Sequence, residues 1–188
     1  MGQMLTAHVA TNLYWFGRHL ERVESTLKDI NRLFDVVIDT DKNAGVAYFE
    51  EVGTTLNYAS ASEFLHEAIF GEHDGNLYQI MAFARENVII CRSQIDADAF
   101  GEVINLHKHF SQMQNSAHFV DHSFIDLALS LINEIWGALS CGLQYRLSDS
   151  FIQLGKLVEK SDLNIRHGRD KEQTRSYFDE ITYTVEAI

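Results

Sequence analysis

The chain has 188 residues, of which 46% are hydrophobic, and it contains no proline. This length fits one domain with a substantial core, and the lack of proline favours long helices over a loop-rich β architecture. Acidic residues outnumber basic ones by 27 to 15, which gives a net charge of −12. Such a charge opposes contact with nucleic-acid phosphates and anionic lipid, so we expect neither partner.

Export and membrane signals are not found in the sequence. Residues 1–6 lack a basic region followed by an apolar stretch, and no apolar run approaches the length of a membrane span. Cys91 and Cys141 lie far apart, without a CxxC pair or histidines at zinc spacing, which favours buried thiols. We therefore expect a soluble, cytoplasmic protein.

The first predicted helix covers about residues 6–38 and has the clearest pattern. Its apolar residues recur at alternating steps of three and four, which is a heptad stripe. They are Leu13, Phe16, Leu20, Val23, Leu27, Ile30, Phe34 and Val37. A polar, glycine-containing segment follows at 39–45 and predicts a loop.

The middle of the chain predicts three further helices. A less regular helical pattern covers 46–70, and a polar, glycine-rich break follows at 71–76. An apolar stripe at helical spacing then runs over 77–95. A shorter helix is expected near 100–110.

The last third of the chain also predicts three helices. Asp121 or Ser123 caps the first of them. The polar residues 148–150 supply cap chemistry for the second, which Gly168 ends. The last helix begins near Asp170.

A charged helical signature occurs twice, within residues 11–38 and again within 149–168. The corresponding pairs, 138 residues apart, are Gly17 and Gly155, Arg18 and Lys156, Glu21 and Glu159, Arg22 and Lys160, Glu24 and Asp162, and Lys28 and Arg166. Because every charge keeps its sign, an internal duplication is the economical explanation. We therefore predict one all-α domain over 1–188, a bundle of six or seven helices with an internal pseudo-repeat.

Helical geometry gathers several of these residues on one flank, beside the apolar stripe. In the first copy they are Gly17, Arg18, Glu21, Glu24 and Lys28. Arg22 is expected to point elsewhere, with Trp15. A glycine on this flank permits close approach by another helix or by a ligand. Two interpretations stay open: the charges of the two copies pair across a structural contact, or they form a partly desolvated ligand site.

Other candidate chemistry is weaker. Glu63 and His66 form a single Glu-x-x-His match, whereas a di-iron bundle needs several inward carboxylates. His118 and His122 have the spacing of a zincin helix but lack its glutamate. No glycine-rich phosphate loop is found either. We therefore expect no cofactor and, because the ligand patterns are weak, no metal. A metal-binding bundle stays as an alternative.

Three stretches resemble the bacterial alpha-E family, a helical domain named for its Glu-Arg motif. Residues 11–24, TNLYWFGRHLERVE, are similar to the opening signature of the family. Residues 84–87 with Arg92 are similar to its central helix, and residues 151–162 to its second Glu-Arg helix. In that last stretch Lys160 replaces arginine, and lysine cannot reproduce the bidentate arginine fork.

The resemblance implies a ligand-binding set on these three stretches. Its members are Arg18, Glu21, Arg22, Glu24, Arg85, Glu86, Asn87, Arg92, Glu159, Lys160, Asp162 and Arg166. The carboxylates would hold cationic or amide donors, and the arginines would meet carboxylates. Longer members continue after the second motif, so we expect a shortened member whose self-association as a homodimer supplies packing surface.

Alpha-E proteins are associated with circularly permuted ATP-grasp ligases and transglutaminase-like peptidases. The resemblance therefore implies a non-catalytic accessory or peptide/amide-binding subunit that works with such a ligase and peptidase. The alternative is an enzyme acting on a small amino-acid or peptide amide at the Glu-Arg face. A cleft reaching Glu21 and Glu159 with unpaired carboxylates favours the enzyme, whereas pairing in a dry interface favours a structural role.

Overall fold

The computed structural model describes residues 5–140 and 146–188. Within these residues the chain forms eight α-helices, one short 3-10 helix and no strand, which confirms the all-α prediction. The elements are α1 (Ala7–Asp39), α2 (Ala44–Glu51), α3 (Ala61–Phe70), α4 (Leu77–Ile90), η1 (Arg92–Gln94), α5 (Ala97–Gln114), α6 (His122–Ser140), α7 (Leu147–Arg166) and α8 (Lys171–Glu186).

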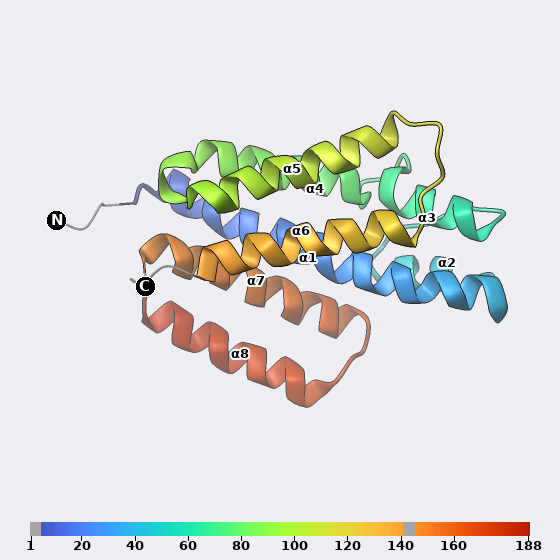
Figure 1. Ribbon diagram of the computed structural model, residues 1–188. Helices are drawn as coiled ribbons and strands as arrows, with labels where there is room; N and C mark the ends of the chain where they lie inside the picture. The colour runs from blue at the N-terminus through green and yellow to red at the C-terminus, as the bar shows by residue number, and fades with distance from the viewer. Residues whose placement is uncertain (1–4, 141–145) are drawn as a thin grey trace.

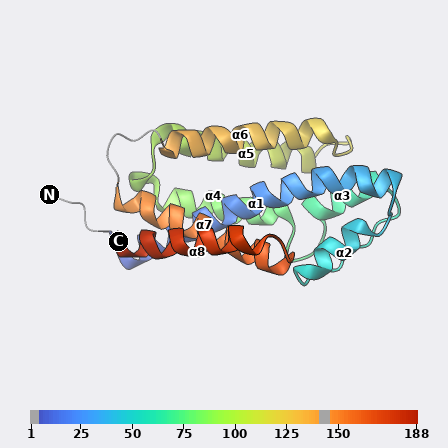
Figure 2. The same cartoon turned by 90° about the horizontal axis from the view of Figure 1, so that it is seen from below.

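Helix α1 forms the centre of the bundle and packs against α7, α4, α6, α2 and α3. Figures 1 and 2 show α5 and α6 as a pair on one side of α1 and α7 and α8 on the other. The hydroxyl of Thr6 accepts a hydrogen bond from the Val9 backbone N–H at 3.3 Å and caps the start of α1. The predicted apolar stripe from Leu13 to Ile30 is fully buried, so the heptad pattern is confirmed as the core face.

The predicted number of helices, six or seven, is too low because the segment 46–70 divides into two helices. Helix α2 ends at Glu51, and Gly53 adopts a φ of +82°, which glycine tolerates and other residues rarely adopt. Ser60 then caps α3 by accepting from the backbone N–H of Glu63 at 3.2 Å. The Glu63 carboxylate accepts from the Ala59 N–H at 2.8 Å and therefore serves the same cap.

The apolar stripe over 77–95 is buried as predicted, although α4 ends at Ile90 and η1 follows. Cys91 lies at this junction and its thiol donates to the Val9 carbonyl at 3.5 Å. Cys91 is 1% exposed, which confirms the predicted buried thiol, and burial raises the pKa of this thiol to about 11. Cys141 lies outside the described residues.

The helix boundaries of the last third follow the predicted signals except at the start of α7. That helix begins at Leu147 after the N-cap residue Arg146, so residues 148–150 lie inside it, although the Asp149 carboxylate accepts from the Arg146 backbone N–H at 3.2 Å. The Asp121 carboxylate accepts from the backbone N–H of Phe124 at 3.0 Å and caps α6. Gly168 adopts a φ of +56° directly after α7, and Asp170 caps α8 by accepting from the N–H of Glu172 at 2.8 Å.

Candidate functional site

Helices α1 and α7 cross at two glycines, Gly17 and Gly155, each of which lies against the backbone of the opposite helix. A Cβ atom on Gly17 would lie 2.1 Å from the Ile152 carbonyl oxygen, and one on Gly155 would lie 2.0 Å from that of Tyr14. Both distances are far below van der Waals contact, so each position requires glycine. The two charged segments therefore lie side by side, and we call their charged side chains the Glu-Arg face.

One half of this face, the closed half, is built around Glu159. This residue is 1% exposed, and one of its oxygens accepts from Nε of Arg18 at 2.7 Å. Its other oxygen accepts from Nε of Arg22. Terminal nitrogens of Arg18 and Arg22 also lie 3.8 Å and 3.6 Å from one oxygen of Asp162. Glu159 is thus paired through both oxygens and fully buried, whereas the side chains of Arg22 and Asp162 are 38% and 27% exposed.

The position of Arg22 corrects the sequence prediction, which directed this side chain away from the flank. Arg22 lies one turn after Arg18, and the glycine crossing brings α7 close to this turn. The long arginine side chain can therefore reach around α1 to Glu159.

The other half, the open half, is built around Glu21. Glu21 is 2% exposed, and its Oε1 atom accepts from the hydroxyl of Ser25 at 2.7 Å. Its Oε2 atom is buried and has no hydrogen-bond partner among the described residues. Burial raises the pKa of Glu21 to about 7, although Lys160 pulls it in the opposite direction. Glu21 is thus a buried carboxyl group with one unused oxygen.

The two lysines of the open half turn to aromatic rings. Nζ of Lys156 lies 3.7 Å from the ring centroid of Trp136 on α6, and Nζ of Lys160 lies 5.7 Å from that of Tyr177 on α8. Burial lowers the pKa of Lys156, and Glu21 opposes this shift. Neither lysine forms an ion pair with a residue that the structure describes, so both cations remain available to a ligand.

Glu24 completes the open half with both oxygens occupied. One accepts from Nζ of Lys28 and the other from the indole N–H of Trp136 at 2.6 Å. Burial alone would raise the pKa of Glu24, but the hydrogen bonds from Lys28 and Trp136 outweigh it and lower the pKa. Sequence reasoning missed Trp136, since it lies on α6, outside both copies of the signature.

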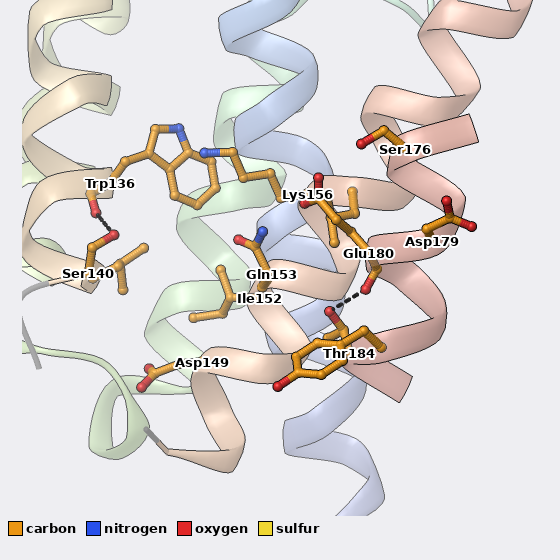
Figure 3. Close-up of a pocket in the computed structure, with 13 residues that line it drawn as sticks. Trp136, Ser140, Asp149, Ile152, Gln153, Lys156, Ser176, Asp179, Glu180 and Thr184 are labelled. Atoms are coloured by element: carbon orange, nitrogen blue, oxygen red, sulfur yellow. Dashed lines mark hydrogen bonds between the residues drawn. The ribbon is translucent and has the colours of Figure 1, made fainter. Parts of the chain in front are cut away.

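Two pockets border the open half. One has a volume of about 490 Å³, is lined by residues of α1, α7 and α8, and includes Glu21, Glu24 and Lys160. The other has a volume of about 630 Å³, lies between α6, α7 and α8, and includes Trp136 and Lys156 (Figure 3). The sequence analysis distinguished carboxylates paired within a contact from unpaired carboxylates beside a cleft. Glu159 is of the first kind, because arginines bind both of its oxygens. Glu21 is of the second kind, because it lines a pocket and its Oε2 atom is unpaired.

The predicted residues on and after α4 lie apart from this charged cluster. Arg85 pairs with its neighbour Glu86 at 2.5 Å on the surface of α4. The guanidinium of Arg92 lies 4.2 Å from the ring centroid of Phe100. Their described partners are thus local, on α4 and α5.

Asn87 and Arg166 have partners on the two helices of the face. The side-chain amide of Asn87 donates to Asn12 at 2.9 Å, and its oxygen accepts from Nδ1 of His19 at 3.0 Å, so it ties α4 to α1. Arg166 is exposed and pairs with Asp162 at 2.9 Å along α7.

A second buried ionic cluster, around Asp29, was not predicted. Asp29 is buried and accepts from Arg32, from Arg169 and from the Tyr48 hydroxyl at 2.8 Å. The ring of Tyr48 stacks on His167 with centroids 4.2 Å apart. The residue that corresponds to Asp29 in the second copy is His167, so the repeated signature gave no signal here. The cluster ties α1 to α2 and to the α7–α8 connection.

Across residues 5–140 and 146–188, no group of three or more His, Cys, Asp or Glu side chains is placed to hold a metal ion. His122 instead has Nδ1 2.5 Å from the side-chain oxygen of Asn31. In the same part of the chain, every helix is too short or too polar to cross a bilayer.

Residues 5–186 match the model of the Alpha-E family, which is described as a predicted alpha-helical domain with a conserved ER motif. No curated protein and no solved structure matches the chain. The first Glu-Arg pair of this chain, Glu21 and Arg22, contributes one residue to each half of the face. The matched region is nearly the whole chain, and the chain therefore belongs to the Alpha-E family.

Proposed function

We propose that this protein is a non-catalytic subunit that binds a peptide or amide and works with an ATP-grasp ligase and a transglutaminase-like peptidase. The observation that carries the proposal is Oε2 of Glu21, which is buried and lacks a hydrogen-bond donor among the described residues. Buried carboxyl oxygens are nearly always hydrogen-bonded, and each exception calls for an explanation. A ligand N–H group would supply the donor.

The pocket beside Glu21 suits an amide. It holds about 490 Å³ and brings Lys160 and Gln173 to the same space as Glu21. The Glu21 oxygen can accept an amide or amine N–H, while Lys160 and Gln173 can donate to a carbonyl or carboxylate oxygen. An amide presents this combination of a donor and an acceptor.

The hydrogen bonds of Glu24 and Glu159, the other buried carboxylates of the Glu-Arg face, support ligand binding rather than acid-base catalysis. A carboxyl pair for acid-base catalysis needs a second acid free to exchange a proton. Both oxygens of Glu24 are hydrogen-bonded, and both oxygens of Glu159 are bound by arginine. A partner enzyme would therefore perform the reaction.

The proposal also includes a bacterial cytoplasmic setting, an internal duplication and self-association as a homodimer. The glycine crossing supports the duplication. Gly17 lies against Ile152 and Gly155 lies against Tyr14, and these two contacted residues occupy corresponding positions in the two copies. A monomeric mass in solution scattering at micromolar concentration would contradict the homodimer.

The test uses purified protein together with an ATP-grasp ligase and a transglutaminase-like peptidase from the same genome. We expect a complex with at least one of them and a faster partner reaction on a peptide amide. Glu21→Gln should keep the complex but lose the stimulation, because its amide places a donor where the ligand needs an acceptor. Glu72→Gln, at an exposed position in the α3–α4 turn, is the matched control. The absence of a complex, or equal stimulation by both variants, would contradict the proposal.

A further inference from the structure

The pocket between α6, α7 and α8 has chemistry that the Glu21 site does not use (Figure 3). Its volume of about 630 Å³ lies within the range of about 300 to 1,000 Å³ typical of small-molecule sites. The larger apolar side chains of its lining are Trp136, Leu139, Ile152, Leu157 and Tyr183. Its charged side chains lie on two helices, Asp149 and Lys156 on α7 and Asp179 and Glu180 on α8. Asp149 already pairs with Arg146 at 3.6 Å, so it offers no free charge to a ligand.

Lys156 supplies a cation without an anion bound to it. Its Nζ lies over the Trp136 ring, and it forms no ion pair within the described part of the chain. Glu21 and Glu24 attract Lys156 from a distance, but both oxygens of Glu24 are already hydrogen-bonded. A ligand carboxylate would form a charge-assisted hydrogen bond with Lys156 in a partly desolvated place, where such bonds are strong.

Asp179 and Glu180 supply the opposite charge from α8. Figure 3 shows both on the α8 side of the pocket, whereas Lys156 extends from α7 toward Trp136. Both acids are exposed, and neither forms an ion pair with any residue that the structure describes. They can therefore hold an ammonium group that enters from solvent.

We propose that this pocket binds a short peptide with apolar side chains and free ends, with its carboxylate at Lys156 and its ammonium group at Asp179 and Glu180. A zwitterion with an apolar body complements Lys156, the two unpaired acids of α8 and the apolar lining. The volume exceeds the needs of a single amino acid, which favours two or three residues. The inference rests on the proposed function, since it names the ligand class of the same binding subunit.

Trp136 provides a direct measurement. The chain has two tryptophans, so Trp15→Phe leaves Trp136 as the only one. Trp15 is partly exposed at the protein surface, and its replacement should leave the fold intact. Titration of this variant with leucyl-leucine and with leucyl-leucyl-leucine should change the Trp136 fluorescence and saturate. Free leucine should bind at least about tenfold more weakly, because it cannot reach both walls.

Capped peptides test each wall on the unaltered pocket. N-acetyl leucyl-leucine lacks the ammonium group, and leucyl-leucine amide lacks the carboxylate. Each should therefore have a dissociation constant at least about tenfold higher than that of the free dipeptide. Lys156→Met should remove the preference for the free carboxylate and keep the preference for the free amine. Asp179→Asn combined with Glu180→Gln should do the reverse, and the exposed positions of both acids make misfolding of this variant unexpected.

Several outcomes would overturn the inference. They are no saturable binding of either peptide, equal binding of free and capped peptides, equal binding of free leucine, or an unchanged end preference in the Lys156→Met variant. These experiments use the purified chain without a partner enzyme. End-dependent binding without a ligase or peptidase complex would refute the proposed function alone, whereas partner stimulation through Glu21 without peptide binding would refute this inference alone.

Discussion

Glu159 and Glu21 occupy corresponding positions on α7 and α1 and are buried to the same extent, with exposures of 1% and 2%. Glu159 receives the Nε groups of two arginines, whereas Glu21 receives one serine hydroxyl. The cations that correspond to the two arginines are lysines, whose compact ammonium groups lie against aromatic rings instead. The same helix crossing thus produces a fully paired carboxylate with arginine, and with lysine a buried carboxyl group that borders a pocket and keeps one oxygen unpaired.

The Glu-Arg pair at the start of the chain belongs to both halves. Glu21 faces the open half, and the next residue, Arg22, reaches the closed half. A substitution in this dipeptide therefore affects either the binding side or the structural side, depending on which of the two residues changes. Substitutions in the two halves, and at the glycine crossing that they share, should therefore differ in how much they change stability.

The largest effect should come from removing both arginines of the closed half. The combined Arg18→Met and Arg22→Met substitutions leave Glu159 buried without a cation, which should lower the free energy of unfolding by about 3–5 kcal/mol. The matched pair in the open half, Lys156→Met with Lys160→Met, should cost less than about 1 kcal/mol. Urea denaturation at pH 7.5 measures both, and equal losses would contradict the division into halves.

The next effect concerns Glu21 and Glu24, whose pKa values shift in opposite directions. The pKa of Glu21 rises from 4.5 to about 7 on folding, so the folded state binds the extra proton and the protein loses stability as pH rises through this window. Glu21→Gln should therefore be more stable than the parent by up to about 3 kcal/mol above pH 7 and equal to it below pH 4.5.

Glu24 should behave in the opposite way, because its pKa is lowered on folding. Its stabilisation is present above pH 4.5, the ordinary value, and is lost as pH falls through the lower folded value. Glu24→Gln should therefore be less stable than the parent at pH 7.5. Unfolding free energies of both variants, measured from well below pH 4.5 up to pH 8, give both curves. If both substitutions stabilise the protein at pH 7.5, or both destabilise it, the assignment is refuted.

A smaller effect is expected at the crossing that both halves share. Gly17→Ala places a Cβ atom 2.1 Å from a backbone oxygen and should destabilise the protein by about 2 kcal/mol. Gly101→Ala in α5 is the control, because nothing lies within 4 Å of its Cβ position and alanine favours helix by up to about 1 kcal/mol. In thermal unfolding, the midpoint temperature should fall for Gly17→Ala and should not fall for Gly101→Ala.

The smallest effect should come from converting the open half into a closed one. Lys160→Arg offers Glu21 a guanidinium N–H like the Nε group with which Arg22 binds Glu159, and should raise the free energy of unfolding by about 1 kcal/mol. The pKa of Glu21 should then fall from about 7, which NMR titration of its carboxyl carbon can follow. A pKa that stays unchanged would show that arginine at this position does not reach Glu21.

The sequence predicted the parts of the fold that depend on local pattern. The heptad stripe placed the first helix at 6–38, one residue from the observed Ala7–Asp39, because buried apolar spacing determines which face packs. The division of 46–70 was missed, since Gly53 and the Ser60 cap lie within a segment whose apolar residues continue without a clear gap.

The candidate site was predictable in position but not in pairing. The matching glycines indicated a close approach, and Lys160 already indicated a weaker carboxylate contact than arginine makes. The lysine partners could not be predicted, because Trp136 and Tyr177 come from α6 and α8 and only the folded chain brings them to the face. Asp29 was missed for the same reason, since Arg169 and Tyr48 lie far away in sequence.

Helix α8 has a consequence for how ligands would be detected. It buries a single residue, Thr184, and packs mainly against α7, so its backbone amides should exchange with deuterium sooner than those of α1. It also lines both pockets of the open half. Occupancy of the pocket beside Glu21 should therefore slow deuterium uptake in the first turns of α8, and occupancy of the pocket beside Trp136 should slow it in the later turns, so that α8 reports which pocket is filled.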